Sequence, residues 1–141
     1  MSDENNEVEI LFVEKWQKED IVRLYRDGNW WDESWDINGI DALISGSFIF
    51  AIALDKKTKS AIGMGRIISD GTSDGYIQDL VVREDQRKKG IGKKILHSLV
   101  SEAQKRGLTW IGLIAEPKTS EFYKTEGFSV MKDHIPMLYR N

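Results

Sequence analysis

The segment from residue 85 to residue 94, DQRKKGIGKK, combines residue types that suit the binding of an anion. Its glycines, Gly90 and Gly92, would let a ligand approach the backbone without interference from a Cβ atom. A run of apolar residues at helical spacing follows, so free N–H groups and the positive end of a helix dipole would face the ligand. Five cationic side chains surround the glycines, although cations in a first helical turn oppose the dipole. The pattern indicates either a cradle for a phosphate-bearing ligand or a solvated basic helix start.

Two common phosphate-binding loops do not fit this spacing. A Walker loop requires G-x-x-x-x-G-K-[ST], whereas the sequence here is G-x-G-K-K. A dinucleotide fingerprint requires G-x-G-x-x-G, whereas position 95 is Ile. A nucleotide loop of either kind is therefore excluded.

The chain is 40% hydrophobic and 30% charged, a composition typical of an ordinary globular protein. We expect one domain over residues 1–141. The absence of cysteine excludes disulfides, thiolate metal sites and cysteine nucleophiles. A net charge of −3 and a pI near 5.4 argue against a nucleic-acid-binding protein. The acidic N-terminus is unlike a secretion signal, and no apolar run approaches the roughly 18–20 residues of a membrane span. We therefore expect a cytoplasmic protein that binds neither nucleic acid nor membrane.

Hydrophobic periodicity predicts a mixed α/β protein, of the α+β kind, with helices packed on the faces of a sheet. The expected strands are 8–13, 48–54, 61–68, 76–82, 108–115, 128–131 and 136–140. Three of the expected helices are 17–26, 37–44 and 120–126. A fourth has its apolar face from Ile91 to Ala103 and stops at Gly107. The anion-binding segment would thus lie between a strand and a helix.

Two motifs in this order resemble the GNAT superfamily of N-acetyltransferases. Residues 87–92, RKKGIG, match the family signature Q/R-x-x-G-x-G/A, and FYKTEGF at 122–128 is similar to its second conserved segment. The resemblance covers essentially the whole chain, although residues 1–45 match only in element type. It implies a twisted, mostly antiparallel sheet of about six to seven strands with about four helices on its faces.

The resemblance also implies acetyl-CoA as a cosubstrate, with its pyrophosphate on backbone amides. Carried over to this sequence, the pyrophosphate loop comprises Arg87, Lys88, Lys89, Gly90, Ile91, Gly92 and Lys93. The lysine side chains would either pair with the phosphates or stay solvated. The strand before the loop is expected to carry a bulge and to offer main-chain groups to the pantetheine arm. Those groups belong to Leu80, Val81 and Val82, of which Leu80 and Val82 are preferred.

Catalytic roles are likewise implied by the resemblance. Tyr123 matches the tyrosine that protonates the departing CoA thiolate, although it could instead pack against the sheet, as the neighbouring Phe122 can. Asp79 and Glu116 are the candidates for a general base, since both are expected near strand ends. Asp79 could equally be structural, and Glu116 departs from the Asn or other polar residue of many relatives.

Neither histidine suggests a metal site. His97 is expected to be exposed on its helix, and His134 lies in a late segment without a clear partner. We expect no metal.

The stretch NWWDESWD at 29–36 is expected to line the acceptor pocket. Its tryptophans and carboxylates would suit an amine through cation–π and charged contacts. The candidates for substrate binding are Trp30, Trp31, Glu33 and Trp35. At least one tryptophan should instead belong to the core.

The expected activity is acetyl transfer from acetyl-CoA to a primary amine of a small molecule. Without cysteine, direct transfer in a ternary complex is favoured. The alternatives are a non-catalytic acyl-CoA sensor, or an acetyltransferase that acts on a protein amine. The resemblance also allows a homodimer.

Overall fold

The computed structural model describes residues 7–141, and the expectation about an N-terminal secretion signal falls partly on residues 1–6, outside that range. The elements, in chain order, are β1 (Val8–Phe12), α1 (Lys18–Asp27), α2 (Gly39–Gly46), β2 (Ile49–Asp55), β3 (Ser60–Ile68), β4 (Asp74–Val82), the short 3-10 helix η2 (Glu84–Gln86), α3 (Ile91–Lys105), β5 (Trp110–Gly112) and α4 (Ser120–Thr125). Within residues 7–141, no helix is both long and apolar enough to cross a bilayer.

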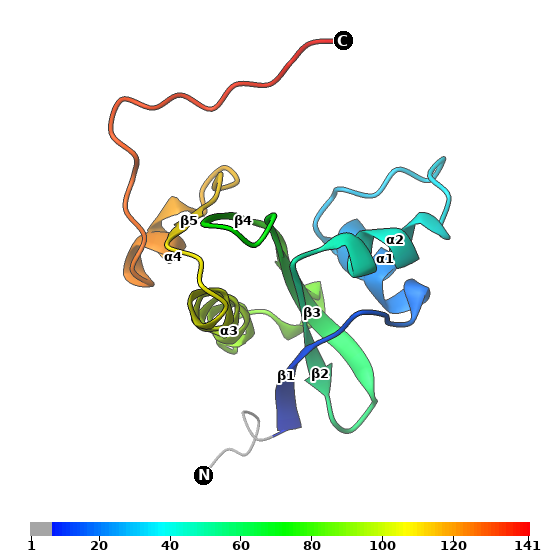
Figure 1. Ribbon diagram of the computed structural model, residues 1–141. Coiled ribbons are helices and arrows are strands. Elements are labelled where there is room, and N and C mark those ends of the chain that lie inside the picture. The colour runs from blue at the N-terminus through cyan, green and yellow to red at the C-terminus, as the bar shows by residue number, and fades with distance from the viewer. Residues whose placement is uncertain (1–6) are drawn as a thin grey trace.

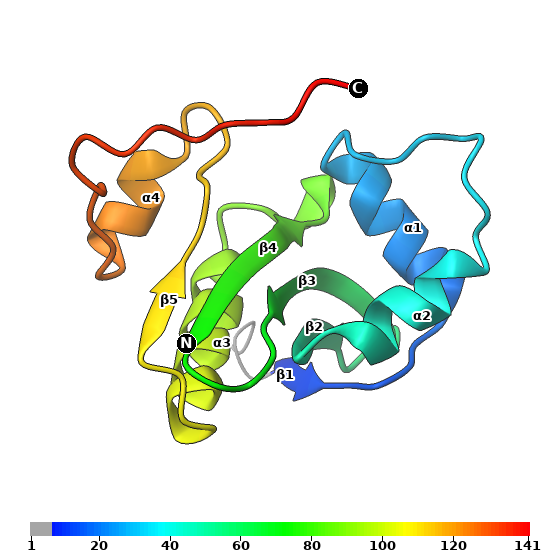
Figure 2. The ribbon, with the colours of Figure 1, turned by 45° about the horizontal axis from the view of Figure 1, so that its top comes forward.

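The strands form a single sheet in the order β1-β2-β3-β4-β5. Strands β1 to β4 pair with one another antiparallel, and β5 runs parallel to β4. Helices α1 and α2 cover one face, and α3 covers the other, as Figures 1 and 2 show. The mixed α/β architecture with a largely antiparallel sheet is therefore confirmed.

Alternation along β2 divides the core into two layers. Phe50 and Ile52 pack with Ile21 and Ile44 of α1 and α2. Ala51 and Ala53, one residue out of phase, join the layer that contains α3. A strand that is apolar on both faces is thus buried between two layers of helices.

Helix α3 approaches the sheet at two glycines of β3. A Cβ atom on Gly63 would lie 2.8 Å from Cδ1 of Ile95, and one on Gly65 would lie 2.9 Å from Cδ1 of Leu99. These distances are shorter than ordinary van der Waals contact, so the glycines let the helix pack directly on the strand. This packing sets the position of α3 relative to β3, and therefore relative to β4, the next strand of the sheet.

The expected bulge in β4 is present. Arg66 of β3 lies opposite Gln78, whereas Met64 lies opposite Val81, so β4 holds one extra residue between these pairs. Asp79, at the bulge, has a φ of 59°, in the left-handed region that non-glycine residues adopt only when something holds them there.

Within residues 7–141 the sheet has five strands rather than the six to seven expected. The predicted strand 108–115 is reduced to Trp110–Gly112, because residues 113–115 leave β4 to line a cavity. The segments 128–131 and 136–140 are not strands. Among residues 7–141 they have no neighbouring strand with which to form a hydrogen-bonded ladder, and most of their apolar side chains are exposed.

Candidate active site

The ladder between β4 and β5 is short, and this opens the sheet. It joins only Asp74–Trp110, Gly75–Ile111 and Tyr76–Gly112. Beyond Tyr76, β4 continues for six residues with β3 as its neighbour on one side. On the other side its backbone borders two cavities, of about 730 and 440 Å³. The half of β4 that β5 leaves unpaired is thus a wall of both cavities.

The two cavities share one wall. Both are bordered by the same five residues, which are Trp30, Leu80, Glu116, Pro117 and Tyr123. The larger cavity extends from there to the start of α3, and the smaller one extends along β4 toward Tyr76. Ligands in the two cavities would therefore meet at this shared wall.

The start of α3 has the features of an anion site. Gly90 adopts a φ of 79°, no side chain caps the helix, and its first turn contains no acidic residue. The first helical bond is donated by the N–H of Lys94 to the carbonyl of Gly90. The preceding N–H groups therefore have no helical acceptor, and they lie at the larger cavity together with Gly90, Ile91, Gly92 and Lys93.

The glycines keep this helix start accessible. No atom lies within 4 Å of the position that a Cβ on Gly90 would occupy. A Cβ on Gly92 would have only ordinary contacts, at 3.7 Å from Val82 and 3.8 Å from Phe122. A pyrophosphate group fits this open cradle of amides, because such groups are bound at helix N-termini.

The cations of the loop have different partners. Arg87 donates to the carbonyl oxygens of Val82, at 3.0 Å, and Asp27, at 3.1 Å. Lys88 and Lys93 border the larger cavity, and Nζ of Lys93 also lies 4.0 Å from Oε2 of Glu126. Lys89 instead donates to Oε1 of Gln86 at 3.3 Å and does not border either cavity. The geometry therefore gives Lys88 and Lys93 the access to an anion that Lys89 lacks.

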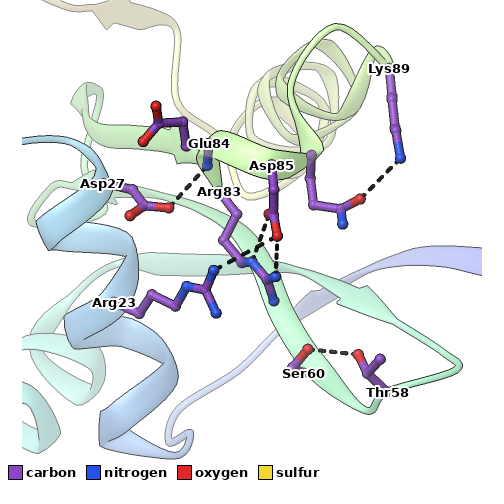
Figure 3. Close-up of polar contacts among 9 residues, drawn as sticks. Arg23, Asp27, Thr58, Ser60, Arg83, Glu84, Asp85 and Lys89 are labelled. Atoms are coloured by element: carbon purple, nitrogen blue, oxygen red, sulfur yellow. Dashed lines mark hydrogen bonds and ion pairs between the residues drawn. The ribbon is translucent and has the colours of Figure 1, made fainter.

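The rim of the larger cavity is braced by polar contacts between α1 and the segment after β4 (Figure 3). The backbone N–H of Glu84 donates to Oδ2 of Asp27 at 2.9 Å. Arg83 pairs with Asp85 at 2.6 Å, and Arg23 of α1 approaches the same carboxylate at 3.8 Å. These contacts connect the end of α1 to η2 and so hold both sides of the rim.

Tyr123 occupies the wall shared by the cavities. Its ring packs between Phe122, at a centroid distance of 5.1 Å, and Phe128, at 5.9 Å. Burial, and secondarily the negative charge of Glu116, raise the pKa of the Tyr123 phenol. The side chain thus packs as an aromatic residue and also keeps its proton at the junction, where it could donate it.

Glu116 borders both cavities from the loop after β5. Its backbone carbonyl accepts hydrogen bonds from Thr119. Its carboxylate has no hydrogen-bond or ion-pair partner among residues 7–141, which leaves it available to a cation.

Asp79 borders the smaller cavity but is already engaged. Its Oδ2 accepts a hydrogen bond from Nε of Arg66 and another from the hydroxyl of Tyr25, each at 2.7 Å. Burial, followed by the charge of Asp79, raises the pKa of Tyr25 and keeps that hydroxyl a donor. Of the two roles considered for Asp79, these contacts favour the structural one, because they hold the bulge between β3 and α1.

Of the four residues expected at the acceptor pocket, only Trp30 borders the cavities. Trp31 packs on Tyr25 at a centroid distance of 6.5 Å, and Trp35 packs on Trp31 at 5.5 Å. Glu33 is exposed and receives hydrogen bonds at 2.8 and 2.9 Å from Arg26, which lower its pKa. The remaining three candidates therefore pack or pair with α1 and with one another, outside both cavities.

Several cavity residues had no signal in the sequence. They are Asp27 and Gly28 at the end of α1, Gln86, Lys118 and Thr119, and Tyr76, Gln78, Leu113 and Ile114. Asn29, which begins the stretch expected at the acceptor pocket, borders the larger cavity. Gly28 and α4 border the same cavity, and this juxtaposition depends on tertiary structure. His97 is exposed and bonds Glu126 at 2.6 Å, and no cluster of metal-ligating side chains exists within residues 7–141.

A mixed sheet that opens beside a helix start with accessible amides is an arrangement typical of α/β domains with a site for a phosphate-bearing ligand. Comparison with known families makes this specific, because residues 7–128 match the model of the Acetyltransferase (GNAT) family. The chain belongs to this family.

Individual relatives agree with this assignment. The uncharacterized N-acetyltransferase ycf52 of Pyropia yezoensis is 33% identical over 99 residues, which are 70% of this chain and 57% of that protein. Serotonin N-acetyltransferase 2, chloroplastic, of Oryza sativa subsp. japonica is 30% identical over 52% of this chain and 37% of its own length. The chain therefore spans about half, or less, of these relatives' lengths. A GNAT-family acetyltransferase structure from Streptococcus pneumoniae superposes with a TM-score of 0.78 at 25% identity, covering 95% of this chain and 98% of that one.

The structural role of Asp79 predicts a loss of stability in Asp79→Asn. Arg66 is only 17% exposed and would lose its counter-charge, so the free energy of unfolding should fall by about 1–3 kcal/mol in urea denaturation. Asp41→Asn is the matched control, because that carboxylate is 58% exposed and pairs with Lys18 at the surface. Equal effects of the two substitutions would contradict the role of Asp79.

Proposed function

We propose that the protein is an N-acetyltransferase that moves the acetyl group of acetyl-CoA to a primary amine of a small molecule. The observation that carries the proposal is the meeting of two cavities at Tyr123, with an anion cradle in one cavity and the carboxylate of Glu116 at the wall of the other. Such an arrangement brings a phosphate-bearing acyl donor and a cationic acceptor to a common point.

The larger cavity suits acetyl-CoA. The pyrophosphate would accept hydrogen bonds from the N–H groups at the start of α3, with Lys88 and Lys93 supplying positive charge. The pantetheine arm carries amides, and it would lie along the main chain of Leu80 to Val82, on the side of β4 that β5 leaves unpaired. The thioester would then reach the wall that contains Tyr123.

Transfer at this wall requires proton movements at the acceptor nitrogen and at the departing sulfur. The acceptor enters as an ammonium ion beside Glu116 and loses a proton to that carboxylate, directly or through water. The amine nitrogen then forms a bond to the thioester carbonyl carbon, the carbon–sulfur bond breaks, and the nitrogen loses its second proton to give the amide. The Tyr123 hydroxyl donates its proton to the departing sulfur and regains a proton, directly or through water, from that nitrogen. Because the chain has no cysteine, no thiol is available to carry the acetyl group, which supports direct transfer in a ternary complex.

The smaller cavity supports a compact acceptor. Its volume is about 440 Å³, within the range typical of sites for small molecules. Trp30 offers an aromatic surface for a cation, and Asp79 is neutralised by Arg66, so Glu116 supplies the unpaired negative charge. One relative is named for serotonin, which is an amine, and a protein amine is the alternative acceptor. We further propose the cytoplasm as the compartment, although that relative is named as chloroplastic.

A screen of amines with acetyl-CoA tests the activity through release of free thiol, with mass spectrometry to detect the acetylated product. Thiol release that depends on a small primary amine supports the proposal. Tight binding of CoA without thiol release from any amine would instead identify an acyl-CoA sensor, and release with peptides alone would identify a protein acceptor.

Gly92→Asp should weaken acetyl-CoA binding by roughly 10- to 100-fold. This is the change in affinity expected from the loss of one or two charge-assisted hydrogen bonds. The added carboxylate would repel the pyrophosphate, yet it would not disturb the fold, because acidic residues stabilise a helix N-terminus. Isothermal titration calorimetry measures the change. Gly39→Asp, in the first turn of α2 with nothing near its Cβ position, is the control and should bind normally. Undiminished binding by the Gly92 variant would contradict the cradle.

Tyr123→Phe should lower kcat by ~100-fold and change the affinity for acetyl-CoA little, because the ring remains and the proton donor is lost. Steady-state kinetics and calorimetry separate the two effects. The raised pKa of Tyr123 means that the phenol stays protonated through neutral pH, so the wild-type rate should show no loss from its ionisation there. Phe122→Leu is the control for packing. An unchanged kcat in Tyr123→Phe would make Tyr123 a packing residue only.

A further inference from the structure

Helix α4 carries Tyr123, yet few contacts attach this helix to the rest of the molecule. It has six residues, none of them buried, and it lies on the β5 side of the molecule, apart from α1 and α2 (Figures 1 and 2). Three aromatic side chains, those of Phe122, Tyr123 and Phe128, pack against the core. Apolar contacts are not directional, and a helix this short is not stable alone. The orientation of Tyr123 therefore requires a further contact.

Glu126, the residue at which α4 ends, makes that contact. Nε2 of His97 donates a hydrogen bond of 2.6 Å to Oε1 of Glu126, and Nζ of Lys93 lies 4.0 Å from its Oε2. Within the described range 7–141, every hydrogen bond and ion pair that joins residues 116–141 to residues 7–115 involves Glu126. Glu126 is thus the polar link between α4 and α3.

The position of Glu126 is unfavourable unless the carboxylate serves such a contact. A negative charge at the C-terminal end of a helix opposes the helix dipole, and this side chain is only 9% exposed. The hydrogen bond from His97, more than any other contact, lowers the pKa of Glu126, so the carboxyl group is ionised at neutral pH. A charge that breaks a local rule often marks a residue with a role in a site.

Glu126 attaches α4 to the part of α3 that forms the anion cradle. Lys93 and His97 are four residues apart on α3, so they lie on the same face of that helix. Lys93 also borders the larger cavity. Phe122 of α4 approaches the same turn, because its Cζ lies 3.8 Å from the position that a Cβ on Gly92 would occupy. The cradle and the helix that carries Tyr123 are therefore joined directly.

We propose that Glu126 is a positioning residue, which holds Tyr123 at a fixed distance from the anion cradle by attaching α4 to α3. This inference rests on the proposed acetyl transfer. Acetyl-CoA would be held by its pyrophosphate at the cradle, whereas its sulfur is at the far end of the pantetheine arm. The proton donor must then keep a constant place relative to the cradle, because a displacement of about 1 Å can cost roughly 100-fold in rate.

Amide hydrogen exchange tests the attachment in the free protein, without any substrate. The N–H of Phe128 donates to the carbonyl of Tyr123 at 3.1 Å, so its exchange reports on how firmly Tyr123 is held. Glu126→Ala should raise the exchange rate of this amide at least about 10-fold relative to the amides of α1, and His97→Ala should do the same. Glu126→Gln retains an acceptor for His97 and should restore most of the protection.

Two further variants make the exchange experiment specific to this contact. Glu121→Ala is the matched control, because Glu121 lies on the same helix, is 83% exposed and pairs with Lys124 of that helix. It should leave the exchange of the Phe128 amide as it is in the wild type. Combining His97→Ala with Glu126→Ala should raise the exchange rate no further than Glu126→Ala alone, because both substitutions remove the same contact.

Kinetics and calorimetry test the consequence for catalysis. Glu126→Ala should lower kcat roughly 10-fold, because Tyr123 is no longer held in place. The affinity for acetyl-CoA should change less than about threefold, because the amides of the cradle remain and the ion pair with Lys93 is weak. Glu126→Gln should recover most of kcat, and Glu121→Ala should leave kcat unchanged.

Three results would each overturn the proposal. They are unchanged exchange of the Phe128 amide in Glu126→Ala, an unchanged kcat in that variant, and a loss of affinity for acetyl-CoA as large as the loss of kcat. A wild-type protein that transfers no acetyl group would instead contradict the proposed function. The exchange of the Phe128 amide would then decide by itself whether Glu126 holds Tyr123.

Discussion

The early end of the β4–β5 ladder is the feature on which the candidate site depends. Three residue pairs hold these strands together, and beyond Tyr76 the chain after β5 turns away to line a cavity. The exposed side of β4 gives the larger cavity a backbone wall, and the bulge at Asp79 lies where the two cavities approach each other. A fully paired sheet would leave neither cavity and would separate the start of α3 from Tyr123.

Local physics explains why some of the site could be predicted from the sequence. The glycine spacing at 90 and 92, directly after a strand and before a helix, determines a helix start with accessible amides, and the structure has this arrangement. The resemblance of FYKTEGF to a known motif singled out Tyr123 as a candidate proton donor, and the structure has Tyr123 at the shared wall. The helix start is set by residues close together in the sequence, whereas the role of Tyr123 was implied by the motif.

The errors concern contacts that form only when the chain folds back on itself. Glu33 was expected in the acceptor pocket, but its pairing with Arg26 depends on how the loop folds back on α1. Alternating residues at 136–140 are typical of a strand. A strand also needs a neighbouring strand with which to pair, and the sequence does not show whether residues 136–140 have one. Arg66 and Tyr25, which hold Asp79, lie 13 and 54 residues away from it along the chain.

Amide hydrogen exchange at the start of α3 most directly tests the central claim, which is that these N–H groups bind the pyrophosphate of acetyl-CoA. The amides of Ile91, Gly92 and Lys93 precede the first helical bond, so they should exchange quickly in the free protein. Saturating acetyl-CoA should slow their exchange, with a smaller effect on the amides of α1 and α2. Binding of acetyl-CoA that leaves these three amides unprotected would contradict the account.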